Sequence, residues 1–209
     1  MRKIALVILS LCFALTAATA QDIFMLSRTG SPRQIEAAIA AGAKVNSIEK
    51  TDQGGISPLM YALRNKDPQV LAVLIREGVD PGFLQRIGNL VWSAPLIQAA
   101  ANENPEYVRL LLAAGAPVDD RNGLDRPPLM LAAQANPEPE ILAALLDGGC
   151  ELEAIDKLGR SALIIAAGKS QNPKVLGALL NAGAKTRLVD RTMRTAQSHQ
   201  LATLAAASK

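Results

Sequence analysis

The sequence predicts an all-α solenoid in which short helix–turn–helix units stack in one dimension, and two recurring landmarks support this fold class. The first is a segment that reads Ser-Pro-Leu-Met-Tyr-Ala-Leu from Ser57, and its copies follow at spacings of 37, 33, 34 and 34 residues. The second is a proline that lies ten residues before a glycine, in the same register. A fixed period of this length is typical of repeat proteins. Neither helix of a unit is long enough to be stable alone, so stacking must bury the apolar faces.

The first helix of each unit is predicted to begin at the first landmark. The second helix is predicted to run from the proline to the glycine of the second landmark. Proline suits the first helical position, where its missing N–H is not needed, and glycine adopts the left-handed conformation that ends a helix. The first landmark is occupied by Pro58, Pro95, Pro128, Ala162 and Ala196; the second spans 32–42, 68–78, 105–115, 139–149 and 173–183. The expected helix caps are Ser31, Ser57, Asp67, Asn104, Ser161, Asn172 and Thr195.

We expect about five repeats, with short β-turn fingers between units and a helical cap at each end. Residues 22–41 are predicted to form an N-terminal capping repeat. Residues 195–207 are predicted to form a single C-terminal helix, whose Ala/Leu face covers the last full unit.

The first twenty residues have the layout of a secretory signal peptide. A basic head precedes an apolar run from Ile4 to Leu15, and small residues at 18–20 favour cleavage before Gln21. A membrane anchor is the alternative, but about a dozen apolar residues are too few to span roughly 30 Å of hydrocarbon. A lipoprotein signal fits less well, because bulky Leu11 precedes Cys12. We therefore expect residues 1–20 to be a signal peptide, residues 21–209 to be one domain, and the location to be periplasmic or secreted.

Charge and cysteine content limit the possible partners and cross-links. Without residues 1–20 the net charge falls from +3 to +1, so there is no case for nucleic-acid binding. Only Cys150 remains after cleavage, and one cysteine cannot form an intrachain disulfide. We expect Cys150 to be a buried apolar residue, with a reactive thiol as the alternative.

These landmarks resemble those of the ankyrin family, whose unit reads D-x-x-G-x-T-P-L-H-x-A-A before a second helix that ends in L-L-x-x-G-A. The resemblance covers essentially all of residues 22–209, and the nearest copy of the turn is Asp156-Lys157-Leu158-Gly159-Arg160-Ser161-Ala162-Leu163. Apolar residues replace the family's histidine, so apolar packing must take over its role; they are Met60, Ile97, Met130 and Ile164. The turn glycine is kept as Gly55 and Gly159. Irregular loops are expected where it is replaced by Trp92, Asp125 and Met193.

No arrangement of residues indicates catalysis. The chain after residue 20 has one histidine, His199, and the sequence has no His/Cys cluster with zinc spacing, glycine-rich phosphate loop or nucleophile elbow. The nearest carboxylate pairs, Glu138/Glu140 and Asp119/Asp120, fit caps or solvated surfaces better than acid–base chemistry. We therefore predict no enzymatic activity, no cofactor and no metal site.

The resemblance implies a protein partner that is bound by the turn tips and by the concave face of the first helices. Aligned with the family's unit, these positions carry seven basic residues and no acidic one. The predicted partner-binding residues are Arg64, Leu90, Val91, Trp92, Leu124, Arg126, Lys157, Leu158, Arg160, Lys169, Arg191 and Arg194.

Two interpretations of these residues stay open at this point. The basic side chains are either neutralised by Asp156 and Asp190 and merely keep the surface soluble, or they attract a partner with an acidic surface. Trp92 either packs against Phe83, Leu84 or Ile87, or it is an anchor in the interface.

The resemblance implies a non-catalytic binding scaffold, which we expect to be monomeric. The export signal and the Asn-Pro starts of second helices favour the periplasm of a Gram-negative-type bacterium, without membrane insertion after cleavage. Periplasmic ankyrin proteins include a class that supports catalase function, so a partner enzyme such as a catalase is one expectation. The alternative is an immunity or inhibitor protein that neutralises an exported toxin. A third class is self-association through an exposed end of the stack, which predicts concentration-dependent oligomers.

Overall fold

The structure, a computed structural model, describes residues 23–51, 54–83, 85–87, 91–135, 138–169 and 173–198. Packing divides the chain into two compact units, Met1–Asp80 and Pro81–Lys209, which we call unit 1 and unit 2 and describe separately. The predicted signal peptide, Asn172, His199 and most of the predicted C-terminal helix lie outside the described residues.

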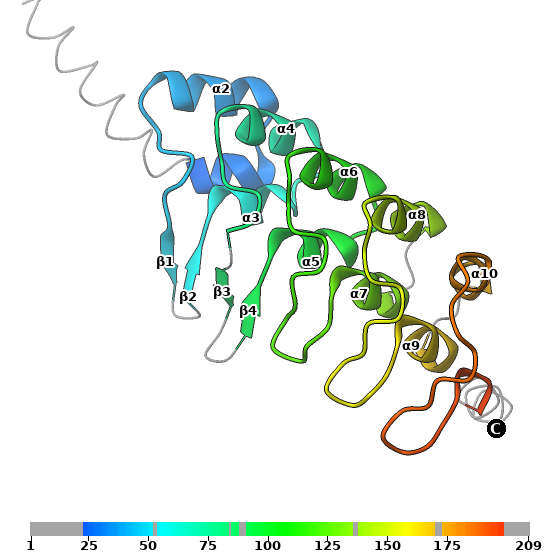
Figure 1. Cartoon of the computed structure of the whole chain (residues 1–209). Helices are drawn as coiled ribbons and strands as arrows, with labels where there is room; N and C mark the ends of the chain where they lie inside the picture. Colours follow the sequence, from blue (N-terminus) through cyan, green and yellow to red (C-terminus); the bar gives the residue numbers. More distant parts are fainter. Residues whose placement is uncertain are drawn as a thin grey trace, which may run out of the picture. The chain divides into compact units, whose positions relative to one another are not determined.

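The described residues of unit 1 form two helix pairs and one hairpin. Residues 23–29 are helical, and the following elements are α2 (Pro32–Ala40), β1 (Glu49–Thr51), β2 (Gly54–Ile56), α3 (Pro58–Ala62) and α4 (Gln69–Arg76). The strands β1 and β2 pair antiparallel, with Lys50 opposite Gly55. Helix α4 packs against both α2 and α3 (Figure 1). The buried Asn65 side chain donates hydrogen bonds to the carbonyl oxygens of Ser27 and Gly30, both at 3.0 Å, and so ties the two helix pairs together.

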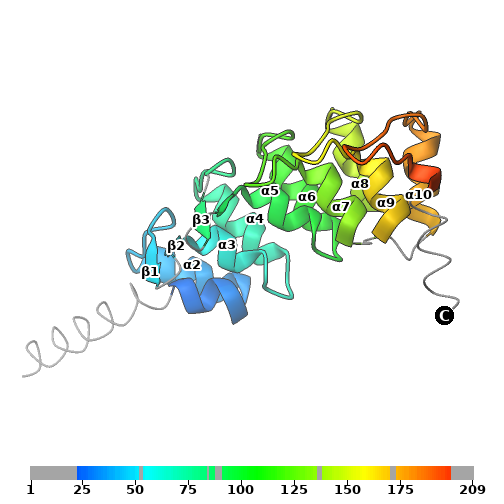
Figure 2. The same cartoon turned by 90° about the horizontal axis from the view of Figure 1, so that it is seen from below.

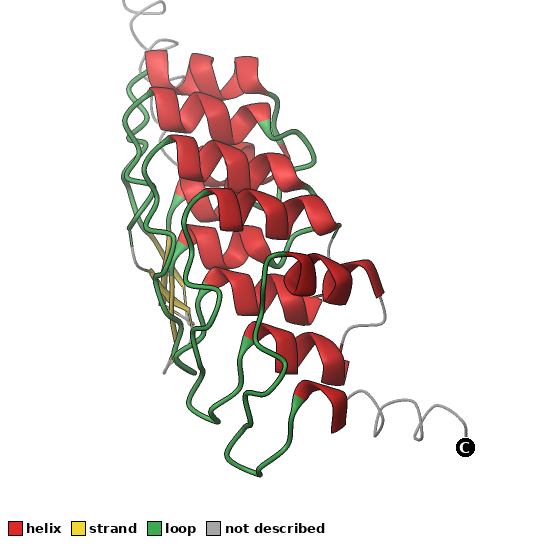
Figure 3. Ribbon diagram, turned by 45° about the vertical axis from the view of Figure 1, so that its right-hand side comes forward, coloured by secondary structure: helices red, strands yellow, loops and turns green. Residues whose placement is uncertain are grey.

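Unit 2 begins with a second hairpin and continues with three helix pairs. Its elements are β3 (Gln85–Ile87), β4 (Val91–Ser93), α5 (Pro95–Ala100), α6 (Pro105–Ala113), α7 (Pro128–Ala135), α8 (Pro139–Asp147), α9 (Ala162–Lys169) and α10 (Pro173–Asn181). The first helices α5, α7 and α9 form one row, and the second helices α6, α8 and α10 form another (Figures 1 and 3). Residues 196–198 begin a further helix. The stack of helix pairs confirms the predicted fold class.

Helix ends follow the prediction closely. The Ser57 hydroxyl accepts from the Met60 N–H, and the Asn104 side chain accepts from the Glu106 N–H, so both residues cap their helices. Each glycine that ends a second helix has a positive φ, between +83° and +99°. The N–H of the residue after each glycine donates to a carbonyl five residues earlier, at 2.9–3.2 Å, which satisfies the helix end. The glycines are Gly42, Gly78, Gly115, Gly149 and Gly183.

Within each unit, the core lies between its first helices and its second helices. The four apolar residues that replace the expected histidine are 1–5 % exposed, which confirms that apolar packing takes over at these positions. Alanines of the first helices, among them Ala99, Ala132 and Ala133, are fully buried and let neighbouring helices approach closely. None of the helices in the described ranges combines the length and the apolar character that a membrane span needs.

A further column of hydrogen bonds joins successive repeats. In each bond, the acceptor is the side chain four residues after the glycine that ends a second helix. The donor is the backbone N–H two residues after the glycine that ends the second helix of the next repeat. Asp119 accepts from the N–H of Glu151 at 3.0 Å, and Glu153 accepts from that of Lys185 at 2.8 Å. In unit 1, Asn46 accepts from Asp80 at 3.4 Å and also donates to the Gly78 carbonyl at 3.1 Å.

Candidate functional site

Three connecting loops of unit 2 have the same internal hydrogen bonds. We call them the Asn122 finger (116–127), the Asp156 finger (150–161) and the Asp190 finger (184–195). In each, the side-chain oxygen of the named residue accepts from the N–H groups two and four residues later, at 2.8–3.1 Å. Its own N–H donates to the carbonyl four residues later, at 2.9–3.1 Å. A short acceptor side chain at this position therefore builds the turn.

The irregular loops expected at Asp125 and Met193 are not found. Gly159 has a φ of +74°, and Asp125 and Met193 adopt the same left-handed conformation at +64° and +60°. The shared hydrogen bonds of the finger outweigh the cost of placing a side chain there, which is about 1–2 kcal/mol for an ordinary residue. The prediction was wrong because it judged the glycine alone.

Backbone hydrogen bonds connect each finger to the next. The Lys157 N–H donates to the Leu124 carbonyl at 3.2 Å, and the Arg191 N–H donates to the Leu158 carbonyl at 2.9 Å. The three fingers therefore lie side by side along one side of the helices of unit 2 (Figure 2). Their tips form a single surface.

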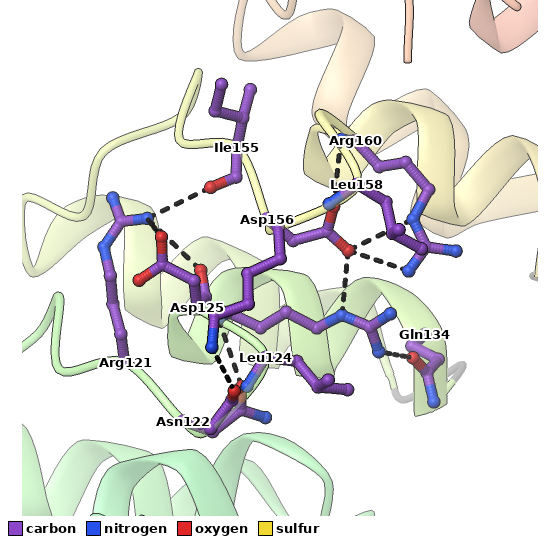
Figure 4. Close-up of polar contacts among 12 residues, drawn as sticks. Arg121, Asn122, Leu124, Asp125, Gln134, Ile155, Asp156, Leu158 and Arg160 are labelled. Carbon is purple, nitrogen blue, oxygen red and sulfur yellow. Dashed lines mark hydrogen bonds and ion pairs between the residues drawn. The ribbon is translucent and has the colours of Figure 1, made fainter. Parts of the chain in front are cut away.

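The Asp156 carboxylate joins two of the fingers. Its side chain is 1 % exposed, and its Oδ2 accepts from Arg126 Nε at 3.0 Å and from Arg160 at 2.7 and 3.1 Å (Figure 4). Arg126 also donates to the Gln134 side chain at 2.6 Å. Burial alone would raise the pKa of Asp156, but the hydrogen bonds from Arg160, Leu158 and Arg126 outweigh it and hold the pKa below its ordinary value.

Arg121 makes a second connection between the same two fingers. Its guanidinium donates to the carbonyls of Asp125 and Ile155 at 3.2 and 3.1 Å (Figure 4). It also pairs with Glu151 at 3.3 Å. Backbone and side-chain bonds together thus fix the relative positions of the Asn122 and Asp156 fingers.

The structure brings several predicted site residues together on the finger surface. Leu124 and Leu158 are 54 % and 52 % exposed, at the tips of consecutive fingers. Lys157, Arg191 and Arg194 are also exposed, and Lys157 Nζ donates to the Gly123 carbonyl at 2.9 Å.

Other predicted residues lie elsewhere or are committed to internal contacts. The side chains of Arg126 and Arg160 are 12 % and 19 % exposed in the ion pairs with Asp156. Arg64 is exposed and follows α3 in unit 1. For Val91, Trp92 and Lys169 only the backbone is described: Trp92 lies in β4 opposite Arg86, and Lys169 ends α9. Leu90 lies outside the described residues, and both interpretations of Trp92 stay open.

Three exposed apolar residues of the finger surface are not among the partner-binding residues predicted from the sequence. Ile155 and Val189 are 51 % and 41 % exposed, and each directly precedes the residue that builds its turn. Met193 is 79 % exposed. The alternation of side chains around the buried Asp156 and Asp190 could have indicated the first two.

Unit 1 has an aromatic contact next to its hairpin. The rings of Phe24 and Tyr61 meet edge to face with centroids 6.2 Å apart. The Tyr61 hydroxyl donates to Glu49, and this hydrogen bond, with burial, raises the pKa of Tyr61. The contact fixes helix 23–29 against α3.

The titratable groups of the described residues do not assemble a reactive centre. No group of three or more His, Cys, Asp or Glu side chains within those residues is placed to hold a metal ion. Cys150 is 8 % exposed, which confirms that it is buried, and burial raises the pKa of its thiol to about 12. The thiolate, which is the reactive form, is therefore scarce at neutral pH.

Comparison with known proteins agrees with the geometry. The sequence matches the family described as ankyrin repeats (3 copies) over residues 23–122 and 96–190, which together span most of the chain. No curated protein matches it. The helix pairs, the fingers and this match lead to one conclusion: the chain belongs to the ankyrin-repeat family.

Proposed function

We propose that this protein is an exported, non-catalytic scaffold that binds another protein through the finger surface of unit 2. Ankyrin-repeat domains are typically non-catalytic modules that bind proteins. The periplasmic or secreted location rests on the basic head, apolar run and small residues of positions 1–20.

The observation that carries the proposal is the exposure of large apolar side chains on a rigid surface. Of the large apolar residues exposed in the described part of the chain, five lie on the three fingers: Leu124, Ile155, Leu158, Val189 and Met193. Apolar side chains gathered on one surface of a soluble domain are typical of interaction sites. Because the fingers are bonded to one another, little conformational freedom is lost when a partner binds.

A capture experiment with matched leucine variants tests this proposal. The purified protein, its Leu158→Asp variant and its Leu180→Asp variant would each be incubated with a periplasmic extract of the host. Leu180 is 43 % exposed but lies on α10, outside the fingers. The proposal predicts a captured protein that is lost with Leu158→Asp and retained with Leu180→Asp.

Equal capture by all three proteins would contradict the finger surface as the binding site. If capture depends on Leu158, the identity of the captured protein decides between the two functions expected from the resemblance. A catalase indicates support of an enzyme, and a secreted toxin indicates immunity.

A further inference from the structure

The three fingers of unit 2 differ in charge. The Asn122 and Asp156 fingers each carry three acidic and two basic residues, whereas the Asp190 finger carries four basic residues and one acidic residue. The basic residues are Lys185, Arg187, Arg191 and Arg194, and all four are exposed. The excess of positive charge is therefore concentrated on one finger.

Charges on the first two fingers are largely compensated within the fold. Asp156 pairs with Arg126 and Arg160, and Glu151 pairs with Arg121. None of the four basic side chains of the Asp190 finger takes part in the ion pairs found among the described residues. Asp190 itself is 6 % exposed and accepts hydrogen bonds from the backbone of its own turn. Residues 191–209 contain no Asp or Glu that could supply a counter-charge.

The same finger offers apolar contacts and a hollow. Val189 and Met193 are exposed among the basic residues. Lys185, Thr186, Arg187 and Leu188 line a cavity of about 340 Å³. The Lys185 backbone is held by the Glu153 side chain at 2.8 Å, so one edge of the cavity is fixed to the preceding repeat.

We infer that the Asp190 finger is a docking site for an acidic segment of the partner protein. Carboxylates of that segment pair with Lys185, Arg187, Arg191 and Arg194, and its apolar side chains contact Val189 and Met193. This inference rests on the proposed function and adds the partner's chemistry and its place on the surface. Residues 184–195 contain no aromatic side chain on which a nucleic-acid base could stack, so a peptide fits them better than single-stranded nucleic acid.

The test uses a defined acidic probe. A fluorescein-labelled dodecapeptide with six glutamates and two leucines is titrated with the protein at low and at moderate salt. A peptide with glutamine in place of glutamate and a dodecamer of single-stranded DNA serve as comparison probes. Binding of the glutamate peptide is expected to weaken as salt rises, because exposed charges are screened.

Two matched variants locate the binding. Arg187→Glu combined with Arg191→Glu is expected to weaken binding of the glutamate peptide at least tenfold. Arg33→Glu combined with Lys44→Glu, which reverses two exposed charges of unit 1 outside the three fingers, is expected to change it less than twofold. Arg187→Gln combined with Arg191→Gln gives a milder version should the double reversal perturb folding, and circular dichroism checks each variant.

Three results would overturn the inference: no binding of the glutamate peptide, an equal loss with the Arg33→Glu and Lys44→Glu variant, or DNA binding as tight as peptide binding. The capture experiment with Leu158→Asp remains independent of all three, so the failure of this inference can be told from the failure of the proposed function.

Discussion

A single carboxylate, Asp156, both builds its own turn and balances two neighbouring arginines. Its Oδ1 accepts from two backbone N–H groups, while its Oδ2 accepts from Arg126 and Arg160. Asn122 builds an equivalent turn without a charge. The two roles of Asp156 can therefore be separated by one substitution.

Asp156→Asn keeps an acceptor for the turn but leaves two mostly buried guanidinium groups without a counter-charge. We expect it to lower the free energy of unfolding by about 3 kcal/mol, the order found when a buried ion pair loses one partner. Urea denaturation measures this change. Asp125→Asn is the control: its side chain is 50 % exposed and 3.8 Å from Arg121, so it should cost less than about 1 kcal/mol. Equal effects of the two substitutions would show that the Asp156 pairs contribute little.

The lowered pKa of Asp156 makes its contribution depend on pH. Because the pKa is lower in the folded state than the ordinary value near 4, the ion pairs stabilise the protein above that value and lose their effect as pH falls through the folded pKa. The difference in unfolding free energy between the native protein and Asp156→Asn should be constant from about pH 5 to 7 and should shrink below about pH 4. A difference that stays constant down to pH 3 would contradict the assignment.

Among the elements, the fingers show how far the sequence could predict the site. The helix pairs follow from Pro, Gly and capping residues, whose effects are local. These predictions are confirmed on the described residues, except that α4 begins at Gln69, with Pro68 as its N-cap residue. The turns at Asp125 and Met193 depend on a side chain three residues earlier that accepts from two backbone N–H groups, so the absence of the glycine does not disrupt them. The burial of Arg126 and Arg160 depends on an aspartate supplied by one repeat to its neighbour, which no single repeat reveals.

Equivalent positions in two fingers should differ in how substitution changes the free energy of unfolding. Gly159→Ala places a Cβ at a φ of +74° and 3.3 Å from the Arg191 backbone nitrogen, so we expect a loss of about 1–2 kcal/mol. Met193→Gly relieves a left-handed side chain but adds freedom to the unfolded chain, so it should be neutral or stabilising by up to about 1 kcal/mol. Thermal and urea denaturation of both variants would measure this. A loss with Met193→Gly as large as with Gly159→Ala would show that strain at this position is negligible.

At the scale of the whole molecule, the column of bonds between successive repeats has one chemical gap. In the preceding pair of repeats, Gly82 takes the place of the acceptor Asp119. Pro117 takes the place of Glu151, whose N–H is the donor. Glycine has no side chain to accept and proline has no N–H to donate, so this bond cannot form there. The chain divides into its two units after Asp80, and Gly82, where the bond is missing, lies two residues further along the sequence.

The division into units also bears on where the partner binds. The long apolar side chains exposed on the fingers and the concentrated basic charge both belong to unit 2. We therefore expect the partner to contact unit 2 and not the hairpin or the helices of unit 1.

Site-specific photo-cross-linking in the living host tests whether the finger surface binds a protein. A photoreactive phenylalanine analogue replaces Leu158 on the Asp156 finger, or Leu180 on α10 as the control, and cross-linked products are resolved by mass. We predict a discrete cross-linked protein partner from position 158 and none from position 180. Cross-links of the same kind from both positions, or from position 180 alone, would contradict it.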